Sequence, residues 1–285
     1  MSIELTNKYA PKADELFKAE SKLSLLTNTD YDWTGAHTVT VMKISTAKMN
    51  DYKRNISEAD DDTLSRFGKI LDLDTQQEEM LLKRDRSFIF NIDKLDSDES
   101  NGQIAAGSAL ARQLREVVIP EVDSYVYQVM VDGAGTVADA EELTGANIYN
   151  AITRGTETLD DAEIPDTERV LVVTPAVYRA LKFAELLNTN CDITAEQRLR
   201  GVIAMIDGMT VVKVPSVRLP ADFGFMIAHP SATVAPVKLE DYGTHDNTPL
   251  SSGTIVTGRI AYDAFVLDNK KMGIYYQPIL TEETE

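Results

Sequence analysis

The stretch Ala109–Met130 reads ALARQLREVVIPEVDSYVYQVM and holds the clearest helical pattern in the chain. Its apolar residues recur at steps of three and four, which predicts an amphipathic helix with one apolar stripe. The stripe comprises Leu110, Leu114, Val117, Val118, Val122, Tyr125 and Val129. With its flanks, the pattern predicts a helix over 98–131, about 50 Å long at 1.5 Å per residue.

Pro120 lies in the middle of this predicted helix. Proline lacks the N–H that would bond to the carbonyl of Glu116, and its ring crowds that carbonyl, so interior prolines bend or break helices. The apolar stripe nevertheless keeps its phase on both sides of the proline. We therefore predict one continuous helix with a bend at Pro120, rather than two separate helices.

Two strand-like segments precede the helix, residues 38–44 (TVTVMKI) and 80–92 (MLLKRDRSFIFNI). The second alternates with period two, and one of its faces changes from apolar to charged and back. Residues 45–79 between them are acidic and weakly patterned, and loops of that length are uncommon in compact domains. We interpret residues 38–92 as a long limb that consists of a strand out, a tip and a strand back.

The charge of the chain is unevenly distributed. There are 46 acidic and 28 basic residues, a net charge of −18, which argues against a protein that reads nucleic-acid sequence. Residues 38–92 hold nine Lys/Arg and ten Asp/Glu, so nearly all of the net charge lies outside the limb. A nearly neutral limb on an acidic body is compatible with docking onto a second copy, while an ordinary charged surface hairpin is the alternative.

The C-terminal half has an α/β pattern. It predicts a hairpin that turns at Asp207–Gly208, and a helix with Thr174 as its N-cap and Pro175 in its first turn. The other expected elements are a helix over 147–159, a strand over 169–173, a strand over 223–228, and two strands within 254–277 joined at DNKK.

The sequence holds little that indicates catalysis. It has no GxGxxG, P-loop, HExxH or GxSxG motif, and no cofactor or metal site is expected. Cys191 is the only cysteine, and an α/β enzyme that pairs it with His229 or His245 is the alternative from another class. No apolar run approaches the ~20 residues of a membrane span, so no membrane partner is expected.

Five segments, in this order, carry a family resemblance. They are YDWTGAHTVTVMKIS, LREVVIPEVDSY, RVLVVTPAVYRAL, IDGMTVVKVPSVRLP and GRIAYDAFVLDNKKMGIYYQ. Together they resemble the major capsid proteins of tailed bacteriophages, especially phages of Gram-positive bacteria. The resemblance implies an α+β, Hong Kong 97-like fold with an N-terminal arm, an extended β-hairpin loop, a peripheral domain with a spine helix, and an axial α/β domain.

The resemblance also implies a division of the chain. The arm would be residues 1–36, the extended loop 37–92, the peripheral domain 93–132 with 254–280, the axial domain 133–253, and the C-terminal tail 281–285. Because the chain begins almost directly with the arm, a separate scaffolding protein is expected.

The implied function is structural rather than enzymatic. Copies would form hexamers and pentamers of an icosahedral shell around double-stranded DNA, assembled in the bacterial cytoplasm and retained in the virion. The implied partners are further copies, a scaffolding protein, a portal protein and DNA bound without sequence specificity. An encapsulin-type compartment is the alternative with the same fold. As an assembly hypothesis, we assign inter-subunit contacts to Trp33, Lys83, Arg84 and Arg86.

Overall fold

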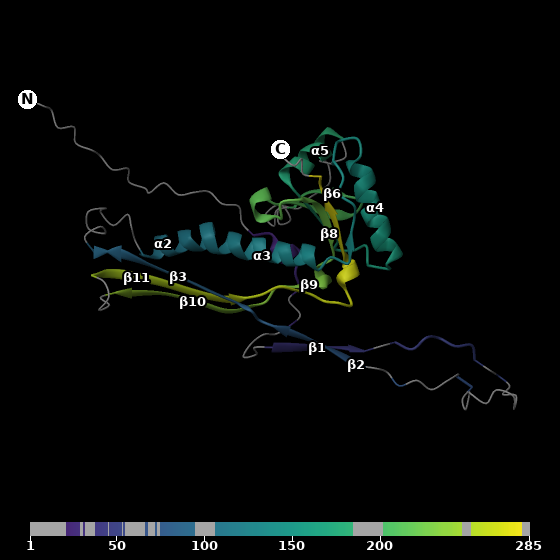
Figure 1. Ribbon diagram of the computed structural model, residues 1–285, viewed down its shortest axis with the longest axis horizontal. Coiled ribbons are helices and arrows are strands. Elements are labelled where there is room, and N and C mark those ends of the chain that lie inside the picture. The colour runs from purple at the N-terminus through teal and green to yellow at the C-terminus, as the bar shows by residue number, and fades with distance from the viewer. Residues whose placement is uncertain are drawn as a thin grey trace, which may run out of the picture. The chain divides into compact units, whose positions relative to one another are not determined.

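The computed structural model of the chain divides into two compact units (Figure 1). We call Gly35–Leu82 the limb unit, and Met1–Thr34 with Lys83–Glu285 the body unit. The structure describes residues 21–28, 31, 38–44, 46–52, 54, 66–67, 72, 75–94, 106–184, 202–246 and 252–280.

The limb unit is built on one antiparallel pair of strands. β1 (Thr38–Ile44) pairs with β2 (Thr75–Leu81), and a cross-strand ion pair joins Lys43 to Glu78 at 2.9 Å. The predicted strands out and back therefore exist. The returning strand does not continue to Ile92 as predicted, because the chain leaves β2 at Leu81 and begins a new strand in the body unit.

That new strand, β3 (Arg84–Asp93), belongs to a three-stranded antiparallel sheet. The sheet order is β10 (Val237–Asp246), β11 (Gly253–Tyr262) and β3. Phe88 of β3 stacks at 6.2 Å on Tyr242 of β10, across the intervening Gly258. A Cβ atom on Gly258 would lie 2.3 Å from the Phe88 ring, so the middle strand requires glycine at this position.

One helical run of 27 residues lies along this sheet (Figure 1). It consists of α2 (Ala106–Gln113), the π-helical turn η2 (Leu114–Val118) and α3 (Ile119–Asp132). The prediction of one continuous helix across the proline is confirmed, while its predicted start near residue 98 lies outside the described residues.

The π-helical turn explains how the helix accommodates Pro120. The amide of Ile119 bonds to the carbonyl of Leu114, five residues earlier, so the turn before the proline is wider than an α-helical turn. Pro120 then falls in the first turn of α3, where its missing N–H and fixed φ are tolerated. The wide turn takes up the disruption without ending the helix.

The helix has two buried faces, where the sequence analysis predicted one. The predicted stripe is half-buried at Val118 and Val122 and 46% exposed at Val117. The deepest positions form a second row, which consists of Asp123, Val126, Tyr127 and Met130. The single-stripe prediction is therefore incomplete, because the second face is buried only by elements far away in the sequence.

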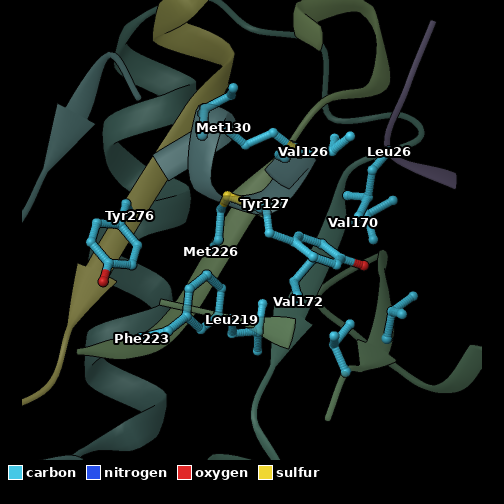
Figure 2. Close-up of a cluster of buried hydrophobic side chains, with 14 of the residues drawn as sticks. Leu26, Val126, Tyr127, Met130, Val170, Val172, Leu219, Phe223, Met226 and Tyr276 are labelled. Atoms are coloured by element: carbon cyan, nitrogen blue, oxygen red, sulfur yellow. The ribbon is translucent and has the colours of Figure 1, made fainter. Parts of the chain in front are cut away.

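That second face packs on a six-stranded sheet (Figure 2). Tyr127 and Met130 of α3 lie against Val170, Val172 and Met226 of the sheet. The strand order is β4 (Thr136–Val137), β13 (Ile274–Pro278), β8 (Phe223–Ala228), β5 (Val170–Val173), β7 (Met209–Lys213) and β6 (Val202–Ile206).

A second core lies on the opposite face of this sheet, under α4 (Ile148–Asp161) and α5 (Pro175–Phe183). The remaining short elements are η1 (Leu23–Leu25), η3 (Ser216–Arg218), η4 (Pro230–Ala232), η5 (Lys271–Gly273), and the pair of β9 (Thr233–Val234) with β12 (Phe265–Val266). Within the described ranges, no helix combines the length and apolarity needed to cross a membrane.

Local predictions in the C-terminal half are confirmed. The Thr174 side chain accepts a hydrogen bond from the Val177 amide at 3.3 Å, and α5 begins at Pro175. The hairpin from β6 to β7 turns at Asp207 and Gly208, with φ of 47° and 78°.

The sheets cross the domain boundaries that the resemblance implied. β10 lies within the segment 133–253 assigned to the axial domain, but it pairs with β11. β13 lies within the peripheral segment 254–280, but it pairs with β8 in the six-stranded sheet. The local pattern identifies a strand without specifying its partner, so these pairings were not accessible from the sequence.

Candidate functional site

The segment before the limb is anchored in the body unit by a buried polar network. Ser21 Oγ donates to Asp123 Oδ1 at 2.6 Å, and Arg218 Nη1 donates to Asp123 Oδ2 at 2.7 Å. Both ends of the ion pair are buried, and Leu26 is fully buried in the core beside it (Figure 2). Burial raises the pKa of the Asp123 carboxyl, against the lowering effects of Ser21 and Arg218.

This anchor refines the implied arm of residues 1–36. Residues 21–28 are part of the body unit, and the amide of Asn28 donates to the carbonyl of Thr233 at 2.8 Å. Trp33, which was assigned an inter-subunit contact, lies outside the described residues.

Arg84 and Arg86, also assigned to assembly, have partners on the spine helix of their own chain. The Arg84 guanidinium lies 4.3 Å above the centre of the Tyr125 ring. Arg86 Nε lies 2.7 Å from Glu121 Oε1. Both side chains therefore hold β3 against α3, whatever else they contact in an assembly.

Lys83 differs from the two arginines. Its backbone N–H donates to Asp263 Oδ2 at 2.8 Å, and the Tyr125 hydroxyl donates to Asp263 Oδ1 at 2.6 Å. No ion pair of its ammonium group is found among the described residues. Lys83 is thus the predicted residue whose charge is most available to a second molecule. The sequence analysis missed Asp263, which no local motif marks.

The limb unit exposes large apolar side chains. Met42 is 67% exposed, Met49 99%, Tyr52 52% and Phe67 77%. The rings of Tyr52 and Phe67 meet edge to face, with 5.2 Å between their centres. This contact fixes the orientation of the exposed aromatic surface before any partner binds. An exposed aromatic pair of this kind is typical of surfaces that bind other protein molecules.

The enzyme alternative gains nothing from the described residues. Cys191 lies outside them. His229 Nδ1 lies 2.8 Å from Ser231 Oγ, and burial lowers the pKa of this imidazole. His245 Nε2 lies 3.1 Å from Thr257 Oγ1. In the described part of the chain, no three His, Cys, Asp or Glu side chains gather as metal ligands.

Comparison with known proteins decides the fold. No family model matches the sequence, and neither does any curated protein. A chain from Mycobacterium phage Che8 superposes with a TM-score of 0.76 at 15% identity, over 97% of this chain and 98% of that one.

Two further similar structures are chains of phage capsids. This chain has the fold of tailed-phage capsid proteins. A chain from the capsid of Cyanophage P-SCSP1u gives a TM-score of 0.72 at 13% identity, over 98% of this chain and 94% of that one. A chain from the mature capsid of bacteriophage PhiM1 gives 0.71 at 12% identity, over 98% and 93%. The α+β, Hong Kong 97-like fold predicted from the sequence is therefore confirmed over nearly the whole chain.

Proposed function

We propose that this chain is the major capsid protein of a tailed phage, and that its copies associate through hexamers and pentamers into an icosahedral shell around double-stranded DNA. The observation that carries the proposal is the end-to-end likeness to capsid chains, which covers at least 97% of this chain in each of the three comparisons above. The likeness includes the limb as well as the body.

The physical properties of the limb support this function. An isolated pair of strands is at best marginally stable in water, and the limb unit exposes four large apolar side chains, one of them, Met42, on the pair itself. Burying that surface on a second copy would stabilise both the limb and the assembly, at roughly 25 cal/mol for each Å² of apolar area removed from water. The work of the chain is then specific self-association, and it acts as a structural component of the virion rather than as an enzyme.

The proposed partners follow from this role. Besides further copies, they are a scaffolding protein and a portal protein during assembly in the host cytoplasm. DNA is enclosed without sequence-specific binding, in keeping with the net charge of −18.

Electron microscopy of the purified full-length protein tests the proposal. We expect closed shells or rings of five and six subunits. A compact monomer at every protein concentration would overturn the proposed function. Nucleic acid inside shells recovered from infected cells would support a DNA container, whereas a protein cargo would indicate an encapsulin-type compartment.

A further inference from the structure

A groove of about 370 Å³ lies beside α5 on the body unit. One wall is α5, the second is the segment Glu142–Gly145, and the third is formed by Ile279 and Leu280 after β13. Two large apolar side chains line it while remaining exposed to solvent, Phe183 at 78% and Leu280 at 62%. The groove therefore offers apolar surface that the described body unit leaves uncovered.

Three exposed cations lie on α5 and on the neighbouring strand β7, although the chain as a whole is strongly acidic. Arg179 of α5 lines the groove and is exposed, as is Glu142 on the second wall. Lys182 of α5 and Lys213 of β7 lie outside the lining. Lys182 and Lys213 place their ammonium groups 5.0 and 5.2 Å from the centre of the same Tyr178 ring. No ion pair of these three cations is found among the described residues. Their charge is available to an acidic partner.

The body unit also carries an acidic loop, residues 162–168 between α4 and β5, whose charge is opposite to that of the cations on α5 and β7. Glu163, Asp166 and Glu168 are exposed on it, together with Pro165. Glu163 and Glu168 have left-handed backbone conformations, with φ of 57° and 62°. Such conformations are uncommon for residues other than glycine, so surrounding structure must hold them.

Arg169 holds the loop from within. Its side chain is 2% exposed, and Nε donates to the carbonyl of Pro165 at 2.8 Å. Nη2 donates to the carbonyl of Ile164 at 2.5 Å, and Nη1 pairs with Asp160 at 2.7 Å. The Arg169 guanidinium therefore points into the body unit and does not neutralise the outer surface of the loop. The carboxylates of the loop face solvent, and the hydrogen bonds of Arg169 fix the loop backbone. Such preorganisation lowers the entropic cost of binding.

The groove and the acidic loop lie at opposite ends of α4. The segment Glu142–Gly145 precedes α4 and lines the groove, whereas residues 162–168 follow it. A helix of 14 residues is about 21 Å long, so one chain does not bring the two surfaces together. A head-to-tail contact between copies needs two different surfaces at opposite ends of one unit, and such contacts form a ring where the rotation between copies closes.

We propose that the groove beside α5 of one copy, together with the cations on α5 and β7, binds the acidic loop 162–168 of the next copy, as a head-to-tail contact within the ring. This inference rests on the proposed function and names the surfaces that join neighbouring body units. The apolar wall at Phe183 and Leu280 favours a protein segment with an apolar residue, such as Pro165, over the phosphates of a nucleic acid.

Charge reversal in the full-length protein tests the contact. The variant Arg179→Glu/Lys182→Glu should assemble at least roughly tenfold more slowly than the wild type at 0.15 M salt, because it sets like charges against each other. Lys238→Glu/Lys271→Glu makes the same change in net charge at exposed positions outside the groove, and should assemble as the wild type does. Light scattering and electron microscopy give the readout, and thermal unfolding verifies that each variant folds.

Rescue is the decisive measurement. Adding Glu163→Lys/Asp166→Lys to the groove variant should restore assembly to within a few-fold of the wild type, since opposite charges face each other again. Failure of this rescue, or equal loss in the Lys238/Lys271 control, would overturn the head-to-tail contact. Retardation of duplex DNA by the wild type, lost in the groove variant, would overturn it in favour of a polyanion site.

The same variants separate this inference from the proposed function. If the wild type forms shells and the groove variant forms them equally fast, the contact fails while the capsid function stands. If the wild type forms neither shells nor rings, the capsid function fails. In that case, sedimentation measures the association of two subunits directly. The contact predicts that two subunits associate in the wild type and in the rescued variant, and that they associate more weakly in the groove variant.

Discussion

At the scale of single residues, Asp123 joins three segments that are far apart in the sequence: the N-terminal segment, α3 and the turn η3. Asp123→Ala removes the carboxylate that pairs with the buried Arg218 guanidinium, and breaking a buried ion pair typically costs about 3–5 kcal/mol. We expect a loss of that size in the free energy of unfolding, measured with denaturant on the unassembled subunit. Ser21→Ala, which removes one neutral donor, should cost only about 1 kcal/mol.

A loss below about 1 kcal/mol for Asp123→Ala would contradict the anchoring role, because it would mean that water replaces the carboxylate. The double change Asp123→Leu/Arg218→Met is the informative control. It removes both charges while keeping bulk, and replacements of this kind are often neutral or stabilising. It should therefore be more stable than Asp123→Ala.

Lys83 and Arg84 are neighbours in sequence whose charges should matter in different ways. Arg84→Glu removes the contact with the Tyr125 ring, so we expect both a lower melting temperature of the subunit and weaker assembly. Lys83→Glu removes a charge that has no ion-pair partner among the described residues, so it should impair assembly while the melting temperature stays within about 1 °C. Equal loss of both properties in Lys83→Glu would place this residue in the intramolecular framework.

The substitution Pro120→Ala tests how the helix accommodates a proline in its interior. In Pro120→Ala the restored amide can bond to the carbonyl of Glu116, which would convert the wide turn η2 into regular helix. We expect the free energy of unfolding to rise by about 1 kcal/mol, the net value of one hydrogen bond. We also expect shells of altered curvature in electron micrographs, if the proline sets a bend that the assembly uses. A less stable variant would instead mean that the fixed φ of proline is what stabilises this turn.

At the scale of elements, the spine helix shows what the sequence can and cannot specify. Its period and continuity were predictable, because an apolar stripe that keeps phase across Pro120 is a local signal. Its second buried face was not, because Tyr127 and Met130 pack in a core with strands that begin at Val170 and later and with Leu26 from the N-terminal segment. The strands were likewise predictable one by one, whereas the pairing of β11 with β3 depends on contacts across at least 160 residues, from Asp93 to Gly253.

Among the candidate surfaces, those marked by a local sequence signal were predictable, and those that depend on distant packing were not. The limb was predictable from its neutral charge and its poor apolar pattern. The partners of Arg84 and Arg86 on α3, and the inward-facing Arg169, were not predictable, because each depends on how distant elements pack.

The limb is the element whose removal best separates folding from assembly. Because the limb unit and the body unit are compact separately, deletion of residues 45–79 should leave a folded, soluble body. Its melting temperature should lie within a few degrees of that of the wild type, and no closed shells should form in electron micrographs. An unfolded deletion variant would show that the limb is needed within its own chain, and closed shells would show that it is not needed between chains.

At the scale of the whole molecule, the net charge of −18 bears on how a shell can hold DNA without binding it. Proteins that bind duplexes non-specifically through Lys and Arg reach Kd values of about 10⁻⁴–10⁻⁶ M at physiological salt, because phosphate contacts release counterions. An acidic subunit lacks this term and repels the duplex over a Debye length of about 8 Å. We therefore expect no retardation of a duplex by micromolar subunit at 0.15 M salt. Binding that weakens steeply between 0.05 and 0.2 M salt would reveal a basic surface facing the DNA, and would refute the idea that acidity keeps the packaged genome from adhering to its container.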